Sequence, residues 1–422
     1  MWALRIFDKN SSRDLRPEFK YTSTMHGDEV VGMELCMELI YDIIDGYYAE
    51  NDTMKYIVEN TDLYILPLHN PDGNYYNSRY NAKGYDLNRS FPEGVYYETD
   101  TVNETEVPEV AAMIDWNKER NFVLSANFHG GALVANYLYD KDFGVASGNY
   151  AACPDDAHVT WLAYNYASRN QPMFSSTSFP DGITNGSEWY SIDGGMQDWN
   201  YRYHNDIDIT LEVSNTKWPS YSTIPSFWSD NRSSMLWYIM AVHRGIKGKV
   251  TSSLTGTPVE ARISVGGIDK DYYTIPSTGE YYRILKPGSY SLTVEAEGFS
   301  TASLTDIVVK DSLATVLNIE LDSVCSIGQG NSLPQGVSLH QNYPNPFNPE
   351  TSIGFTVEKT SNLSLTVYNK KGESVQVLTD KKHTPVDYLY RFNGKKFSAG
   401  EYYYELKDQN GAKDTKKMLM LK

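Results

Sequence analysis

Residues 21–29 read Y-T-S-T-M-H-G-D-E, a short run of strand character that ends in the pattern H-x-x-E. Catalytic zinc sites take three protein ligands from His and Glu and leave a fourth position open for water. His26 and Glu29 supply two such side chains just after a predicted strand, and His129, in N-F-H-G-G, supplies a third far along the chain. These three residues are therefore a candidate set of zinc ligands.

The sequence around this motif predicts an α/β fold. From residue 1 to about 243, short apolar runs alternate with helical patterns, which favours a sheet with helices on both faces. Buried strands are predicted at 21–25, 63–68, 122–128 and 207–213, and helices at 32–48, 107–119, 157–169 and 226–242. Chemistry in such folds collects in loops beyond the carboxyl ends of the strands. His26, Asn70, His129 and Glu212 lie at or near predicted strand ends, which indicates one common site.

Four further motifs follow H-G-D-E in order along the chain. They are N-P-D-G at 70–73, D-L-N-R at 86–89, G-G-M-Q-D-W-N-Y at 194–201 and I-T-L-E at 209–212. The ordered set resembles the zinc metallocarboxypeptidases, in particular the branch of carboxypeptidases D, E, M and N. The resemblance covers residues 1 to about 243. It implies a mixed, mostly parallel sheet, and one Zn²⁺ per chain bound by His26, Glu29 and His129.

The same resemblance implies roles for three residues near the metal. Glu212 ends an apolar strand and matches the general base, and its apolar neighbours should raise its pKa into the range of proton transfer. Arg79, in N-S-R-Y-N, matches the arginine that steadies a developing oxyanion. Asp86 matches the carboxylate that orients a ligand imidazole, here that of His26. A turn aspartate and a surface arginine remain the alternatives for Asp86 and Arg79.

Substrate-binding residues also follow from the resemblance. Asn88 and Arg89 match a clamp for the terminal carboxylate, to which the planar guanidinium is suited. Tyr190 matches the mobile tyrosine that closes over the substrate. Asp140 aligns with an acidic residue that binds Lys or Arg side chains, and Gln197 lies at the pocket-floor position. The resemblance thus implies release of C-terminal Arg or Lys, although a lysine directly follows Asp140 and D-L-N-R-S replaces the commoner D-L-N-R-N.

Charge is distributed unevenly along the chain. Residues 1–245 carry 17 Lys+Arg against 35 Asp+Glu, a net of −18, while the remaining residues carry 20 against 19, or +1. An acidic half repels nucleic acid and attracts cationic substrates, although acidity also serves solubility alone. The sequence contains no run of about twenty apolar residues, so it predicts no membrane span.

Two small all-β sandwiches are predicted after the α/β region. Residues 246–322 have short alternating strands with Gly/Pro turns and resemble a transthyretin-like domain. A polar stretch at 323–338 is a predicted linker. Residues 339–422 begin with L-H-Q-N-Y-P-N-P-F-N-P and resemble the C-terminal sorting domain of proteins exported by type IX secretion, so the second sandwich is expected to be immunoglobulin-like. The resemblance implies that the secretion machinery is a partner and that the protein is secreted or displayed at the cell surface.

The start of the chain and the range of substrates leave alternatives open. W-A-L-R-I-F follows Met1 directly, whereas relatives place a further helix and strand before it, so an N-terminally truncated chain without its signal peptide is expected. Peptide or protein C-termini are the expected partners. A carboxypeptidase of broader or cell-wall-peptide specificity is one alternative. An inactive surface protein that binds peptides is another, which the complete ligand and base set argues against.

Overall fold

A computed structural model describes residues 1–92, 102, 104–311, 313–323, 333 and 336–421. The chain forms two compact units, one of residues 1–297 and 301–322 and the other of residues 298–300 and 323–422. The first unit contains both the α/β region and the first β-sandwich. The two segments that the sequence distinguishes at about residue 245 therefore pack together.

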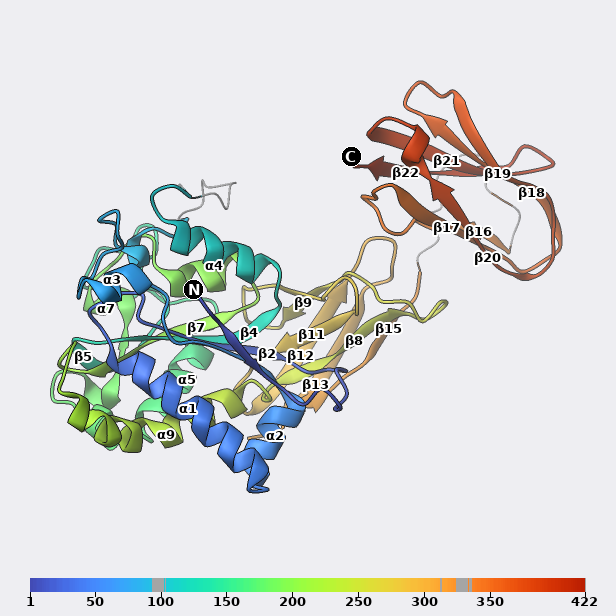
Figure 1. The fold of residues 1–422 in the computed structure, drawn as a ribbon. Helices are drawn as coiled ribbons and strands as arrows, with labels where there is room; N and C mark the ends of the chain where they lie inside the picture. The colour runs from blue at the N-terminus through green and yellow to red at the C-terminus, as the bar shows by residue number, and fades with distance from the viewer. Residues whose placement is uncertain (93–101, 103, 312, 324–332, 334–335, 422) are drawn as a thin grey trace. The chain divides into compact units, whose positions relative to one another are not determined.

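A seven-stranded sheet with the order β1-β3-β2-β4-β7-β5-β6 forms the centre of the first unit (Figure 1). Its strands are β1 Leu4–Ile6, β2 Glu18–Ser23, β3 Asp62–Leu66, β4 Phe122–His129, β5 Ala132–Tyr137, β6 Ile183–Asn185 and β7 Ile207–Ser214. Four neighbouring pairs are parallel, and only β1 on β3 and β5 on β7 run antiparallel. The prediction of a mixed, mostly parallel sheet is confirmed, and each of the four predicted strands is present.

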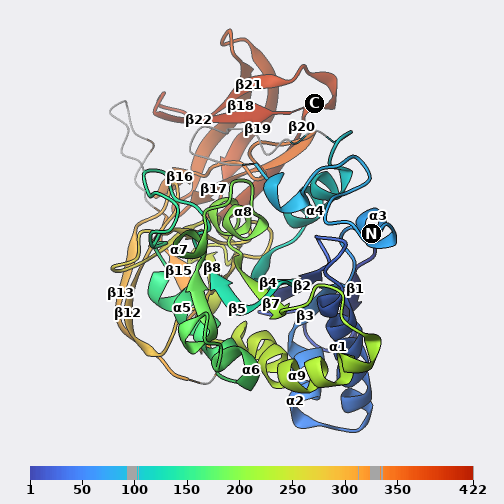
Figure 2. The ribbon, with the colours of Figure 1, turned by 90° about the vertical axis from the view of Figure 1, so that its left-hand side faces the viewer.

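Helices cover both faces of this sheet, as predicted (Figures 1 and 2). Long helices pack together on one face, where they enclose the larger apolar core. A second apolar core lies under two helices on the other face and includes Met113 and Trp199. The larger core is covered by α1 Val31–Tyr48, α5 Asp156–Ala167 and α9 Ile224–Ala241, and the smaller by α4 Pro108–Lys118 and α8 Met196–Tyr203. Shorter helices are α2 Asp52–Asn60, α3 Pro71–Tyr75, α6 Gln171–Phe174 and α7 Gly186–Trp189.

The first β-sandwich belongs to the same unit. One sheet has the order β10-β9-β12-β13, and the other has the order β11-β8-β14, with β15 also paired to β8. The strands are β8 Ile246–Ser252, β9 Arg262–Val265, β10 Tyr272–Tyr273, β11 Glu280–Arg283, β12 Gly288–Glu295, β13 Ala302–Val309, β14 Thr315–Val316 and β15 Ile319–Leu321. Both sheets are antiparallel except where β14 and β15 lie parallel to β8.

The second unit contains two further sheets around one apolar core. One sheet has the order β16-β17-β20, with β16 Val337–Leu339, β17 Glu350–Val357 and β20 Val386–Asn393. The other has the order β19-β18-β21-β22, with β18 Ser361–Asn369, β19 Ser374–His383, β21 Gly400–Asp408 and β22 Lys413–Met420. The linker predicted at 323–338 falls largely outside the described residues, and its last two residues already belong to β16. Within the described ranges, every helix is too short or too polar to cross a lipid bilayer.

Candidate metal centre and substrate pocket

The loop that carries H-G-D-E is held by the N-P-D-G motif. His26 follows the end of β2 by three residues, and the side chain of Asn70 donates a hydrogen bond to the carbonyl of Met25 at 3.1 Å. The two loops pack so closely that a Cβ on Gly27 would lie 2.0 Å from the carbonyl carbon of Gly73. Only glycine fits at position 27. Because Gly27 has no side chain, the N-P-D-G loop can pack directly against the backbone next to His26 and hold it in position.

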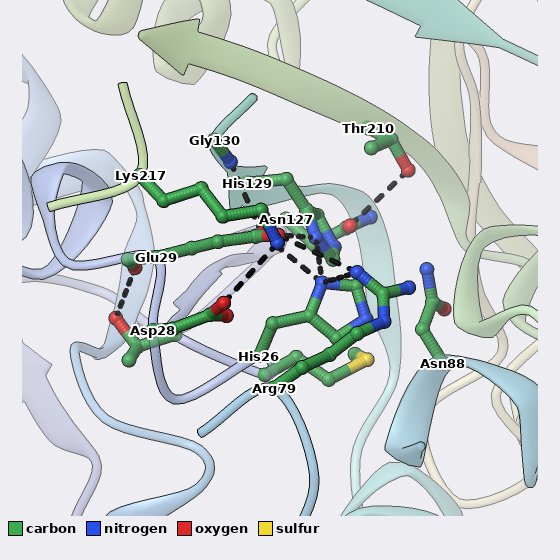
Figure 3. Close-up of polar contacts among 12 residues, drawn as sticks. His26, Asp28, Glu29, Arg79, Asn88, Asn127, His129, Gly130, Thr210 and Lys217 are labelled. Carbon is green, nitrogen blue, oxygen red and sulfur yellow. Dashed lines mark hydrogen bonds and ion pairs between the residues drawn. The ribbon is translucent and has the colours of Figure 1, made fainter. Parts of the chain in front are cut away.

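Two side chains of this loop and His129, at the end of β4, converge with their ligand atoms facing one another (Figure 3). His26 Nδ1 lies 3.0 Å from Glu29 Oε2, and His129 Nδ1 lies 2.9 Å from the same oxygen and 3.0 Å from His26 Nδ1. Each residue is only 3% exposed. A tetrahedral zinc ion with bonds near 2.1 Å holds its ligand atoms about 3.4 Å apart, so a small expansion of this triangle accommodates it. The donor set and the spacing both fit Zn²⁺.

Hydrogen bonding behind the triad selects which ring nitrogen of His26 faces inward. Asp86 Oδ1 lies 3.1 Å from His26 Nε2 and also accepts the backbone N–H of Asn88 at 3.0 Å. Burial lowers the pKa of His26, but Glu29 and Asp86 together raise it above its usual value. Burial raises the pKa of Glu29, yet the two imidazoles hold it far below its usual range. The triad therefore presents an ionised carboxylate to a cation.

Two cationic side chains reach the outer oxygen of Glu29 from the rim of the site (Figure 3). Lys217 Nζ lies 2.9 Å from Glu29 Oε1, and Arg79 Nη1 lies 3.5 Å from the same atom. Their side chains are 38% and 26% exposed. Arg79 also donates through Nε to Asp86 Oδ2 at 2.8 Å. Sequence reasoning missed Lys217, because it lies in a loop and belongs to none of the quoted motifs.

Glu212 lies beside the triad because β4 and β7 pair in parallel. The register of these strands sets His129 directly opposite Glu212. Glu212 is 9% exposed, and among the described residues its Oε2 has no hydrogen-bond partner. Burial and the nearby charge of Glu29 raise the pKa of Glu212 to about 8. A carboxyl group with such a pKa can accept and return a proton near neutral pH.

A single cavity joins the triad to the residues predicted to bind substrate. Its lining includes eight of the eleven predicted site residues: His26, Arg79, Asn88, Arg89, His129, Asp140, Tyr190 and Glu212. The other three lie behind the lining, where Glu29 and Asp86 contact the histidines and Gln197 contacts Asp140. Tyr190 directly follows α7 at the rim, where it is 44% exposed.

Asp140 is a buried residue in the lining of this cavity and is held by two amides. Its Oδ1 accepts hydrogen bonds from Asn136 Nδ2 at 2.9 Å and from Gln197 Nε2 at 2.8 Å. Burial is the main cause that raises the pKa of Asp140 well above its usual range, and the neighbouring carboxylate of Asp198 raises it further. Lys141 does not neutralise it, because its ammonium group pairs with Asp193.

Sequence reasoning missed four lining residues, among them Thr210 and Asn136. Thr210 precedes Glu212 by two residues on β7, so strand alternation places both on one face of the sheet. Its hydroxyl donates to Asn127 Oδ1 at 3.1 Å. Asn136 lies on β5, which the sequence analysis did not predict as a strand. The alternation of β7 was a usable signal for Thr210, whereas Asn136 required knowledge of β5.

Three consecutive segments of the chain match models of protein families. Residues 1–234 match the family model described as "Zinc carboxypeptidase". Residues 245–322 match "Carboxypeptidase regulatory-like domain", and residues 341–421 match "Secretion system C-terminal sorting domain". All three domain resemblances inferred from the sequence are thereby confirmed.

Individual relatives agree with these matches. Mouse carboxypeptidase M is 41% identical over 304 residues, which cover 67% of this chain and 67% of that protein. Human carboxypeptidase D is 38% identical over 334 residues, or 72% of this chain and 24% of that protein, so the chain spans about a quarter of its length. Among solved structures, thrombin activatable fibrinolysis inhibitor has 19% identity and a TM-score of 0.46, covering 56% of this chain and 64% of that one.

Proposed function

Because the chain belongs to the zinc carboxypeptidase family, we propose that it is a secreted, zinc-dependent enzyme that hydrolyses the C-terminal peptide bond of peptides. One observation carries the proposal. A triad with zinc-ligand chemistry, a buried carboxyl group and two arginines all line or adjoin the same pocket. Peptide or protein C-termini are the proposed partners.

His26, Glu29 and His129 are the proposed ligands of one zinc ion. Two neutral imidazoles and one carboxylate would leave the ion a net positive charge. Zinc bound there would supply a Lewis acid that polarises a carbonyl group and lowers the pKa of a water molecule. The contact with Asp86 supports this assignment, because it engages Nε2 of His26 and so turns Nδ1 toward Glu29 and His129.

The remaining proposed roles belong to side chains of the chain itself. Arg89, with Asn88 beside it, would bind the terminal carboxylate and so restrict cleavage to the last peptide bond. Glu212 would take the proton of the attacking water and return it to the leaving amine. Arg79 would donate hydrogen bonds to the oxygen of the scissile carbonyl as negative charge develops. Tyr190, at the rim, would cover the bound residue.

Release of C-terminal Arg or Lys is the proposed preference. Asp140 is 3% exposed, and burial opposes its ionisation, so the arrival of a cationic side chain would favour the charged form. The acidic balance of the first 245 residues would also draw cationic peptides toward the site. The raised pKa of Asp140 favours a second candidate as well, because a protonated Asp140 would accept neutral residues and broaden the specificity.

Export is proposed from the C-terminal domain. Residues 341–421 match a sorting domain, which supports recognition by type IX secretion machinery and delivery to the cell surface or the medium. A cell-surface protein that binds peptides without cleaving them is the alternative from another functional class.

The test measures release of the last residue from peptides that end in Arg, Lys, Phe or D-Ala, with and without a zinc chelator. We expect release of Arg and Lys that chelation abolishes and that falls by about 10²- to 10⁴-fold in Glu212→Gln. Equal rates with all four peptides would support the broader specificity. Zinc binding without any release would support the binding protein, and failure to bind zinc would refute the proposal.

A further inference from the structure

Helix α8 holds the pocket around Asp140 on one side. Gln197 donates to the Asp140 side chain, and the carboxylate of Asp198 accepts the backbone N–H groups of Asp140 and Lys141 at 2.9 and 3.0 Å. Arg202, at the other end of the helix, donates to the carbonyl of Lys141 at 2.7 Å. The position of Asp140 therefore depends on the position of α8.

The β-sandwich holds the same helix from the opposite side. Tyr201 on α8 donates its hydroxyl to Asp155 Oδ2 at 2.9 Å, and Asp155 Oδ1 accepts from Arg283 Nη2 of the sandwich at 2.5 Å. A second sandwich residue, Lys270, donates from Nζ to the carbonyl of Arg202 at 3.2 Å. Two links thus run from the sandwich to the last turn of α8.

The first of these links contains an ion pair that is buried from water. Its charges therefore have no solvent to pair with if they separate, which makes the link rigid. The side chains of Arg283 and Asp155 are both 0% exposed. Removing one member of such a buried pair leaves the other charge unpaired, so the pair stays together whenever the protein is folded. The guanidinium also lies 4.3 Å from the ring centre of Tyr272, which fixes its plane further.

We infer that the β-sandwich positions the specificity pocket, with Arg283, Lys270 and Tyr201 as positioning residues that act on Asp140 through α8. The inference rests on the proposed function, because it assigns the cationic side chain of the substrate to Asp140. None of the hydrogen bonds described above involves a residue of the triad or Glu212. Loosening the links should therefore weaken binding of a basic residue without changing the chemical step.

The test uses the full chain with the double variant Tyr201→Phe/Lys270→Met, which leaves the pair of Arg283 and Asp155 intact. The matched control is Tyr166→Phe/Lys249→Met. Tyr166 is a buried tyrosine whose hydroxyl bonds to Asn231 at 3.0 Å, and Lys249 is a sandwich lysine paired with Asp14. KM and kcat are measured for peptides that end in Arg and in Phe, well below the unfolding temperature.

We expect KM for the Arg peptide to rise about tenfold in the test variant, since two hydrogen bonds of ordinary strength are lost. The kcat for that peptide and KM for the Phe peptide should stay within about twofold of wild type, as should all constants of the control. An unchanged KM for the Arg peptide, or equal losses with both peptides, would overturn the inference. If wild type itself releases neither residue, the proposed function fails instead, so the two failures are distinguishable.

Discussion

The metal triad and the junction between α5 and the sandwich both bury a carboxylate, but they neutralise it differently. At the junction Asp155 pairs with Arg283, and both side chains are 0% exposed. In the triad, the inner oxygen of Glu29 faces two imidazoles, and its cationic partners Arg79 and Lys217 are 26% and 38% exposed. The junction pairs its carboxylate with a buried cation of the chain itself, whereas the proposed zinc ligands of the triad would take their cation from outside the chain.

This difference separates a charge that maintains structure from one that serves binding. A buried ion pair that the chain completes contributes chiefly to which parts of the protein pack together. A buried carboxylate beside titratable imidazoles, with its permanent cations at the rim, can exchange its partners.

The largest effect is expected when the junction is broken. Arg283→Met leaves Asp155 buried and unpaired, so the free energy of unfolding should fall by about 3–5 kcal/mol, and adding Asp155→Asn should restore most of it. Glu29→Gln should cost the zinc-free protein less than Arg283→Met does, because the cationic partners of Glu29 are partly exposed and water can solvate them once they are unpaired. Urea denaturation of the zinc-free proteins measures all three. If Arg283→Met and Glu29→Gln lowered the free energy of unfolding by similar amounts, the junction and the triad would not differ in how they neutralise their carboxylates.

Zinc should stabilise the protein through the triad alone. A ligand that binds only the folded state, at 100 to 1,000 times its Kd, raises the free energy of unfolding by about 2.7–4.1 kcal/mol. We expect this gain in wild type and in Lys249→Met, and none in His129→Ala. Thermal unfolding with increasing zinc gives the measurement, and a gain that survives in His129→Ala would place the metal elsewhere.

Acid should lower the free energy of unfolding by a smaller amount, through His158 at the junction between α5 and the sandwich. Burial lowers the pKa of His158 to about 4, and its Nδ1 accepts the backbone N–H of Lys286 in the sandwich. Between about pH 6.5 and pH 4 the unfolded chain binds a proton that the folded chain refuses, so stability falls as the pH falls through this window. The loss from this residue is at most about 3 kcal/mol.

The variant His158→Gln isolates this contribution, because an amide oxygen can still accept the N–H group. Comparing the unfolding free energies of the zinc-free proteins from about pH 7 down to about pH 4, wild type should lose more stability than His158→Gln. Parallel curves would show that His158 does not hold its neutral form in the folded protein.

How much the sequence predicted depended on the length and pattern of each segment. The central strands β3, β4 and β7 are rich in apolar side chains and were predicted, as was the more polar β2, E-F-K-Y-T-S. β6 has three residues, and α8, M-Q-D-W-N-Y-R-Y, mixes polar and aromatic side chains without a helical apolar repeat, so neither was predicted. Short or polar elements form because the surrounding packing selects them, which local propensity does not report.

The residues of the candidate site also differ in whether the sequence alone could predict them. The triad residues and Glu212 lie in motifs that can be recognised in the sequence alone, while Asn136 and Lys217 belong to no such motif. The junction could not be predicted either, since Asp155 and Arg283 lie 128 residues apart and each is an ordinary charged residue in its own segment. Residues that act together within a short motif can be recognised in the sequence. Residues that meet only when the chain folds leave no local pattern.

The smallest effect is expected at an exposed ion pair, which completes the comparison. Arg232 Nε lies 3.0 Å from Asp42 Oδ2, within hydrogen-bonding distance like the pair at the junction, but the two side chains are 44% and 24% exposed. Water solvates both charges when the pair separates, so Arg232→Met should change the free energy of unfolding by less than about 0.5 kcal/mol. Urea denaturation beside Arg283→Met measures the contrast. A loss comparable to that of Arg283→Met would mean that contact distance governs the stability of these pairs, and that burial does not.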